Sequence, residues 1–181
     1  MKTTGNQSVK IIPLGGLEQI GMNITAFEYE DTIVVVDCGL AFPTDDMLGI
    51  DLVIPDVTYL KDNIEKVKGF VITHGHEDHI GGIPFLLQVV KIPFIYASPL
   101  ACAMITRKLE EKRLTNATHL IRIDDEYQIK TKYFNIGFFK TNHSIPESLG
   151  IIINSPNGRI VSTGDFKFDL TPVGDPADFQ K

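Results

Sequence analysis

The sequence predicts a single α+β domain with many short strands and a few helices. Nine short runs rich in β-branched and aromatic residues recur along the chain, and most are bounded by Gly, Pro, Asn or Asp. With 181 residues, 43% hydrophobic and 22% charged, the chain can bury one core and has the composition of a globular protein. Because no internal repeat, low-complexity stretch or linker divides it, one unit is expected.

The expected strands are separated by turn residues. A single Asp31 between the second and third runs predicts a tight hairpin, and the Pro-Asn-Gly sequence at 156–158 predicts another, so antiparallel pairing is expected. The runs are VKIIPL (9–14), NITAFEYE (23–30), TIVVVD (32–37), GFVIT (69–73), PFIYA (93–97), THLIRI (118–123), YFNIGFFKT (133–141), GIIINS (150–155) and RIVST (159–163).

Three helices are expected between these strands. One opens near Asp78 and runs through the apolar segment IPFLLQVV. A second covers residues 99–114, PLACAMITRKLEEKRL, because Pro99 suits a first helical turn and the charges come late. A third, shorter helix is expected from about Thr58 to Lys66.

Composition and charge narrow the function classes. A net charge of −6 and a pI near 5.3 oppose binding of nucleic acid by bulk charge, although bound divalent cations would reverse the sign locally. No apolar run approaches the roughly 20 residues that span a bilayer, and the N-terminus lacks a secretory signal, so a cytoplasmic protein without membrane contact is expected. Cys38 and Cys102 are expected to be buried thiols rather than a disulfide or a metal site.

The most informative stretch is THGHEDHIGG, residues 73–82, directly after an apolar run. His74 and His76 are two residues apart, so their rings lie on the same side of an extended segment, and Asp78 and His79 follow after a turn. Without a cation, converging buried side chains of this kind would leave donors and acceptors unpaired, at about 1–3 kcal/mol each. The pattern therefore predicts a metal site.

The segment HEDH superficially matches the H-E-x-x-H helix of metalloproteases. Its spacing differs, because His76 and His79 are three residues apart rather than four, and the neighbouring glycines favour a loop that enters a helix. Glu77 is then expected to face away from the metal.

The H-x-H-x-D-H pattern, with DCG upstream and GD downstream, resembles the metallo-β-lactamase superfamily. Longer strings stand in the order typical of the ribonuclease J family of β-CASP ribonucleases, from about Val9 to Pro176. The resemblance implies an αββα sandwich. The strings are LGGLEQIGMN, DCGLAFP, LGIDLVIPD, THGHEDHIGGIPFLL, HSIPES and STGDFKFDLTPVGDP.

The resemblance also implies two metal ions and their ligands, residue by residue. Three imidazoles suit zinc as the first ion, and manganese would also tolerate the mixed nitrogen and oxygen ligands. The ligands of the first metal would be His74, His76 and His143; those of the second would be Asp78 and His79; Asp165 would bridge both.

Other polar residues receive different expectations. Asp37 closes the run TIVVVD as the family's first acidic motif does, and is expected to hold the ligand loop or a histidine's second nitrogen without binding metal. His119 alternates with apolar residues in a strand and is expected to be structural. Lys167, between two phenylalanines, could approach a phosphate but is more simply a solvated charge.

The function that the resemblance implies is a metal-dependent ribonuclease. Its substrate would be single-stranded RNA, cut internally or degraded from a 5′ monophosphate end in mRNA decay and rRNA maturation, with Asp78 orienting the nucleophile or moving its proton. A thioester or lactone hydrolase on the same fold, and a non-catalytic partner subunit, are the alternatives. The strings FPTDDMLGID and TGDFKFDLTPVG oppose the first, and the intact HGHEDH opposes the second.

The family places one more histidine ligand of the second metal, and the β-CASP domain, downstream of Lys181. Residues 1–181 are therefore expected to be the N-terminal portion of a metallo-β-lactamase domain. By itself this portion would keep the three-histidine site, hold the second metal weakly and show little ribonuclease activity. Homo-oligomers, or pairing with a related subunit, are implied for the longer protein.

Overall fold

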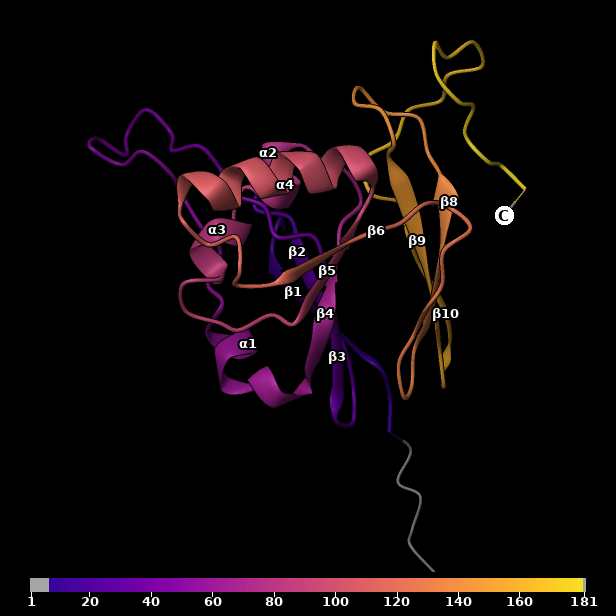
Figure 1. The fold of residues 1–181 in the computed structure, drawn as a ribbon, viewed down its shortest axis with the longest axis horizontal. Helices are drawn as coiled ribbons and strands as arrows, with labels where there is room; N and C mark the ends of the chain where they lie inside the picture. Colours follow the sequence, from indigo (N-terminus) through magenta and orange to yellow (C-terminus); the bar gives the residue numbers. More distant parts are fainter. Residues whose placement is uncertain (1–6, 181) are drawn as a thin grey trace, which may run out of the picture.

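The computed structural model describes residues 7–180 and consists of two stacked β-sheets with helices on one side. Figure 1 shows the helices against one face of the larger sheet and the strands β8–β10 against its other face. The predicted α+β class is confirmed, and the layers run helix, sheet, sheet. In residues 7–180 no helix is long and apolar enough to cross a membrane.

The larger sheet has six strands in sequence order, β1-β2-β3-β4-β5-β6. The first three strands pair antiparallel, whereas β3 to β6 pair parallel. The parallel part brings the C-terminal ends of β3 and β4 to the same edge. The strands are Lys10–Gly15 (β1), Ile24–Tyr29 (β2), Thr32–Val36 (β3), Val67–Val71 (β4), Phe94–Ala97 (β5) and His119–Arg122 (β6).

The smaller sheet is antiparallel, in the order β10-β9-β8-β7. All nine predicted strands are found, and the two-residue β7 is the strand that the sequence did not reveal. The first hairpin is one residue longer than predicted, because both Glu30, at φ 51°, and Asp31 lie in its turn. The strands are Ile129–Lys130 (β7), Asn135–Lys140 (β8), Leu149–Ser155 (β9) and Gly158–Ser162 (β10).

Helices are found in the three predicted regions, but the one expected at 99–114 ends at Glu111, and the one expected at 58–66 is a short helix followed by a 3₁₀ turn. The single helix expected from Asp78 is wrong, because Pro84 has no N–H and the Gly82 N–H donates to the carbonyl of Cys38 at 2.9 Å instead of to the preceding turn. Ser98 caps the helix that starts at Pro99, as predicted. The helices are Thr58–Asp62 (α1), followed by a 3₁₀ turn at Ile64–Lys66, then Glu77–Ile80 (α2), Ile83–Leu86 (α3) and Pro99–Glu111 (α4).

The β3 strand separates two apolar cores and is buried on both faces. Ile33 and Val35 pack toward the helices, whereas Val34 and Val36 pack toward the smaller sheet. This alternation fixes the register of the strand, because a slip by one residue would exchange its two faces. The thiols of Cys38 and Cys102 are buried and free, as predicted, and burial raises the pKa of both.

A buried carboxylate fastens α1 and the 3₁₀ turn that follows it to the sheet. Glu28 on β2 is 3% exposed and accepts hydrogen bonds from the Tyr59 hydroxyl and, at 3.0 Å, from the Lys66 ammonium. Burial alone would raise the pKa of Glu28, but these two hydrogen bonds, together with the charges of Lys10 and Lys66, outweigh burial and hold the pKa below its ordinary value. Burial and the Glu28 carboxylate together raise the pKa of the Tyr59 phenol to about 12.

We expect Glu28→Gln to lower the free energy of unfolding at pH 7 by roughly 1–3 kcal/mol, because a buried charge-assisted contact is lost. The folded pKa lies below the ordinary value of 4.5, so the Glu28 contribution is complete above pH 4.5 and disappears as the pH falls through the folded pKa. Urea unfolding at pH 7 and at acidic pH measures the difference in unfolding free energy between the unmodified chain and Glu28→Gln, which should become smaller at acidic pH. The exposed Glu65→Gln is the control. A difference in unfolding free energy that does not change with pH would contradict a stabilising role of the ionised Glu28.

Candidate metal centre

The ligand loop, residues 73–79, leaves the end of β4 and enters α2. Three backbone N–H groups from residues 23–40 donate to the carbonyls of residues 77–79, at 2.8–3.2 Å. The β1–β2 loop and the segment after β3 therefore fix the position of the ligand loop through backbone hydrogen bonds. Gly39 permits this contact, because a Cβ at that position would lie 1.6 Å from the carbonyl oxygen of Asp78.

Three predicted ligands form one group, the three-histidine cluster of His74, His76 and His143. The Nδ1 atom of His76 lies 3.0 Å from Nε2 of His74 and 3.1 Å from Nε2 of His143. Two of the rings come from the ligand loop, and the third comes from the loop between β8 and β9. The stacking of the two sheets thus brings residues 67 positions apart into contact.

The spacing of these nitrogen atoms fits a cation. His74 has Nδ1 at 3.0 Å from the Thr73 hydroxyl, which leaves the lone pair of its Nε2 facing the cluster when Nδ1 carries the proton. A proton on Nδ1 of His76 can be donated to only one of the two neighbouring Nε2 atoms, so at least one pair of nitrogen lone pairs faces each other. Tetrahedral zinc ligands at 2.0–2.1 Å would lie about 3.3 Å apart, close to the spacing found.

Of the other predicted ligands, His79 and Asp165 group with His74, and Asp78 lies beside His79; Asp78, His79 and Asp165 are called the carboxylate–histidine cluster below. Nε2 of His79 lies 3.5 Å from Oδ2 of Asp78 and 3.6 Å from Oδ1 of Asp165. The second oxygen of Asp165, Oδ2, lies 3.7 Å from Nε2 of His143. Asp165 therefore turns one oxygen to each cluster, which is the arrangement expected of a bridging carboxylate.

The Asp37 carboxylate orients rings of both clusters. It accepts hydrogen bonds from the Thr73 backbone N–H at 2.8 Å, from the Thr73 hydroxyl at 2.9 Å and from Nδ1 of His79 at 2.8 Å. Because the Thr73 hydroxyl also contacts His74, Asp37 acts on one ring directly and on the other through Thr73. This geometry leaves Nε2 of both rings available for a ligand.

The environment sets the charge of the rings. Burial, reinforced by the three neighbouring imidazoles, lowers the pKa of His74 to about 2, so this ring is neutral and can donate its lone pair. Burial also lowers the pKa of His143. Burial opposes protonation of His79 too, but the hydrogen bond and the charge of Asp37 outweigh it and raise the pKa of His79.

Two residues of the centre were missed by sequence reasoning. The Asn23 amide nitrogen lies 3.2 Å from the Asp78 carbonyl, from the Asp78 carboxylate and from Nε2 of His79. Its place at the end of the string LGGLEQIGMN was the only sequence indication. Thr73 stood next to the histidines, but a lone threonine carries no chemical pattern.

The remaining predictions concern residues outside the clusters. Glu77 points away from them, as predicted, and pairs with Lys108 on α4. His119 lies on β6 and is exposed, so its place in a strand is confirmed. Lys167 is exposed and pairs with Asp169 at 3.1 Å, which agrees with a solvated charge.

A helix–sheet–sheet fold with histidine and aspartate clusters at the ends of the strands defines a class of metal-binding proteins, and comparison with known families identifies it. The model of the metallo-β-lactamase superfamily matches residues 20–179. The chain belongs to the metallo-β-lactamase superfamily.

Within that superfamily the chain is similar to ribonuclease J proteins, which confirms the resemblance seen in the sequence. It is 56% identical to ribonuclease J 1 of Streptococcus pyogenes over 96% of its own length and 31% of that protein. It is 48% identical to ribonuclease J of Synechocystis over 99% of its own length and 28% of that protein. The chain thus spans about a third of the length of these relatives and matches their N-terminal part.

Solved structures share the fold at low identity. The metallo-β-lactamase fold protein YhfI from Bacillus subtilis superposes with a TM-score of 0.60 at 21% identity, over 91% of this chain and 65% of that one. The short form of human tRNase Z gives a TM-score of 0.58 at 20% identity, over 87% and 68% of the two chains. These similarities support the architecture.

We expect Asp37→Asn to weaken zinc binding by about 10- to 100-fold, because an amide cannot accept from every donor that the carboxylate holds and the His79 ring loses its orientation. Competition with a chromophoric chelator measures the affinity. Asp51→Asn, at an exposed position, is the control. An Asp37→Asn protein that keeps its fold by circular dichroism and its zinc affinity would contradict this positioning.

We expect Gly39→Ala to displace the ligand loop, because the new Cβ would overlap the carbonyl of Asp78. The loss of unfolding free energy should exceed about 3 kcal/mol, since the clash is with backbone atoms. Gly137→Ala is a matched control, because a Cβ there meets no atom within 4 Å. Thermal unfolding and metal content per chain are the measurements. Equal values for Gly39→Ala and Gly137→Ala would show that the close contact between Gly39 and the Asp78 carbonyl does not require a glycine.

Proposed function

We propose that this chain is the N-terminal catalytic part of a metal-dependent ribonuclease that acts on single-stranded RNA. The main support is the position of Asp165, whose two carboxylate oxygens face the two ligand clusters. The chain is also 56% identical to a ribonuclease J over 96% of its length. Such a pair of adjoining clusters suits the in-line displacement of a phosphodiester.

The chain's own residues would hold two divalent cations, zinc or manganese. When bound, such cations lower the pKa of water and polarise a phosphoryl group. The three-histidine cluster offers a complete nitrogen face for the first cation. The carboxylate–histidine cluster would hold the second with the bridging Asp165, and a further ligand is expected from the longer protein.

Asp78 is the residue best placed to handle the proton of the attacking water. The Asn23 amide holds Oδ2 of Asp78 at 3.2 Å, which fixes the plane of the carboxylate and directs Oδ1 away from that contact. The side chain of Asp78 is 33% exposed, so water can reach it. We infer that Asp78 orients the water and accepts its proton as the bond to phosphorus forms.

The substrate class and the cellular context complete the proposal. The protein would act in the cytoplasm on single-stranded RNA, as a 5′-to-3′ exonuclease preferring a 5′ monophosphate and as an endonuclease, in mRNA decay and rRNA maturation. The acidic composition is compatible with this substrate, because the cations supply positive charge at the reaction site. A β-CASP domain and oligomerisation, as homo-oligomers or with a related subunit, belong to the longer protein.

We expect the chain loaded with zinc or manganese to cleave 5′-labelled single-stranded RNA slowly, and chelation to abolish this cleavage. Asp165→Asn should reduce cleavage by about 100-fold or more, because both clusters lose a charged ligand. Asp169→Asn, the same change four residues along the same loop, should have little effect. Denaturing gel electrophoresis of the products measures the rate.

Three other outcomes would contradict the proposal. Hydrolysis of thioesters or lactones without RNA cleavage would assign the chain to another hydrolase class of the superfamily. Metal binding with neither activity would favour a non-catalytic subunit. RNA cleavage that Asp165→Asn leaves unchanged would come from a contaminant or from another site.

A further inference from the structure

We propose that a cavity between the two sheets, lined by none of the predicted metal ligands, together with a row of aromatic rings beside it, is a docking site for single-stranded RNA. The cavity has a volume of about 270 Å³ and lies between the larger sheet and β7. Residues that begin β4 and β5 line it, whereas the ligand loop follows the C-terminal end of β4. The choice of RNA as occupant rests on the proposed ribonuclease function.

The opening exists because the smaller sheet covers only part of the larger one. β7, at its edge, has two residues, so on the face of β5 that meets the smaller sheet the part around Phe94 is left uncovered, whereas Tyr96 still packs against the core between the sheets. Along β5, Ile95 and Ala97 are fully buried against the helices, whereas Phe94 is 39% exposed and Tyr96 is half-buried. The uncovered face is therefore aromatic.

Four rings follow one another across this region. The centroids of His119 and Phe94 are 5.9 Å apart, those of Phe94 and Tyr96 are 6.2 Å apart, and those of Tyr96 and Tyr127 are 6.3 Å apart. His119 is exposed and Tyr127 is 38% exposed. A row of partly exposed rings on a sheet suits the stacking of unpaired bases, whatever their sequence.

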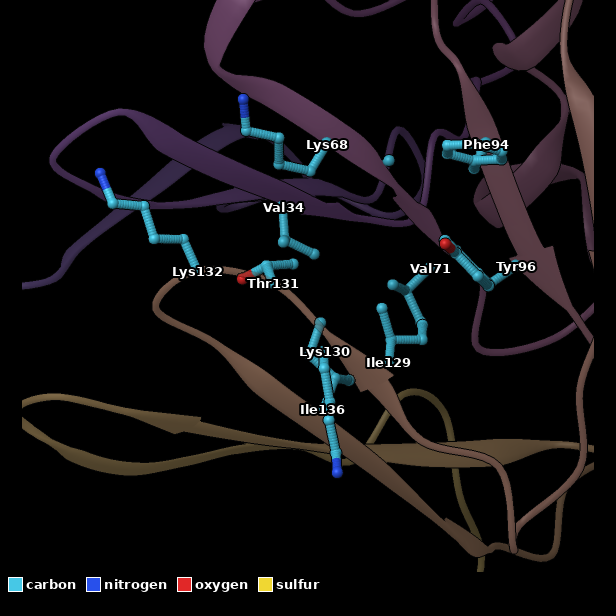
Figure 2. Close-up of a pocket in the computed structure, with 11 residues that line it drawn as sticks. Val34, Lys68, Val71, Phe94, Tyr96, Ile129, Lys130, Thr131, Lys132 and Ile136 are labelled. Atoms are coloured by element: carbon cyan, nitrogen blue, oxygen red, sulfur yellow. The ribbon is translucent and has the colours of Figure 1, made fainter.

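Three lysines surround the cavity. Figure 2 shows the amines of Lys68 and Lys132 directed outward on one side of an apolar lining that includes Val34 and Val71, and the amine of Lys130 directed outward on the other side. Lys132 pairs with Asp31 at 2.9 Å, and the Lys68 amine donates to the Glu65 backbone carbonyl at 3.0 Å, but between residues 7 and 180 no carboxylate pairs with the amine of Lys68 or Lys130. In a chain of net charge −6, this is a local excess of positive charge that suits phosphates.

The combination favours RNA over other occupants. An apolar peptide or a second copy of the chain would not bind to lysines that lack a carboxylate partner. An acidic protein surface would not require a row of aromatic rings. Single-stranded RNA presents both flat bases and phosphates at every nucleotide. RNA bound at this site would contact the protein outside the ligand clusters where cleavage is proposed.

Fluorescence anisotropy with a labelled 12-nucleotide single-stranded RNA, recorded in EDTA, tests the site while the metal centre can neither bind nor cleave RNA through a cation. We expect binding that weakens with salt and falls about tenfold in Phe94→Ala and at least tenfold when Lys68→Glu and Lys130→Glu are combined. Lys61→Glu, the same charge change at an exposed position on α1 outside the cavity, should bind as the unmodified chain does.

Phe94→Leu keeps apolar bulk without the ring, so it tests stacking if Phe94→Ala unfolds. Absence of RNA binding, or equal binding by the lysine variant and Lys61→Glu, would overturn the proposal. A change in sedimentation without a change in RNA affinity would assign the surface to a second copy and would also overturn it. Metal-dependent cleavage is measured separately, so its failure alongside intact binding in EDTA would count against the ribonuclease function and not against this site.

Discussion

The metal centre depends on one buried carboxylate, that of Asp37. A buried charge is costly unless it is hydrogen-bonded, and Asp37 meets the backbone and hydroxyl of Thr73 and the ring of His79. These contacts join the end of β3 to the start of the ligand loop after β4 and to α2. Asp37 has φ of 60°, an unfavourable backbone angle for an aspartate, and the three partners hold the residue there.

The sheets supply the rest of the geometry. Parallel pairing of β3 with β4 sets Asp37 beside the ligand loop, and the stacking of the smaller sheet brings His143 and Asp165 over it. A hydrogen bond of 2.9 Å from the Leu149 N–H to the Thr73 carbonyl joins the two sheets beside the clusters. The predicted ligands therefore lie in three loops that follow β4, β8 and β10, so their convergence depends on the stacking of the two sheets and not on one loop.

Sequence reasoning reached the strands and the ligand pattern because both rest on local spacing. Runs of β-branched and aromatic residues bounded by turn residues located nine strands, and the two-residue interval of His74 and His76 correctly predicted that their rings lie together. What it missed depends on long-range contacts. Asn23 meets Asp78 across 55 residues, and the helix expected after Asp78 breaks because Gly82 donates to a distant strand end. The family resemblance supplied the pairing with His143 and Asp165, which no spacing could have indicated.

The most direct measurement is a crystal structure of the chain grown with zinc, with diffraction recorded at the zinc absorption edge. We expect an anomalous peak at about 2.0–2.1 Å from Nε2 of His74, Nδ1 of His76 and Nε2 of His143. A second, weaker peak is expected beside His79 and Asp165. Zinc bound only at other residues, or none in crystals soaked at saturating concentration, would contradict the central claim that these side chains form a metal centre.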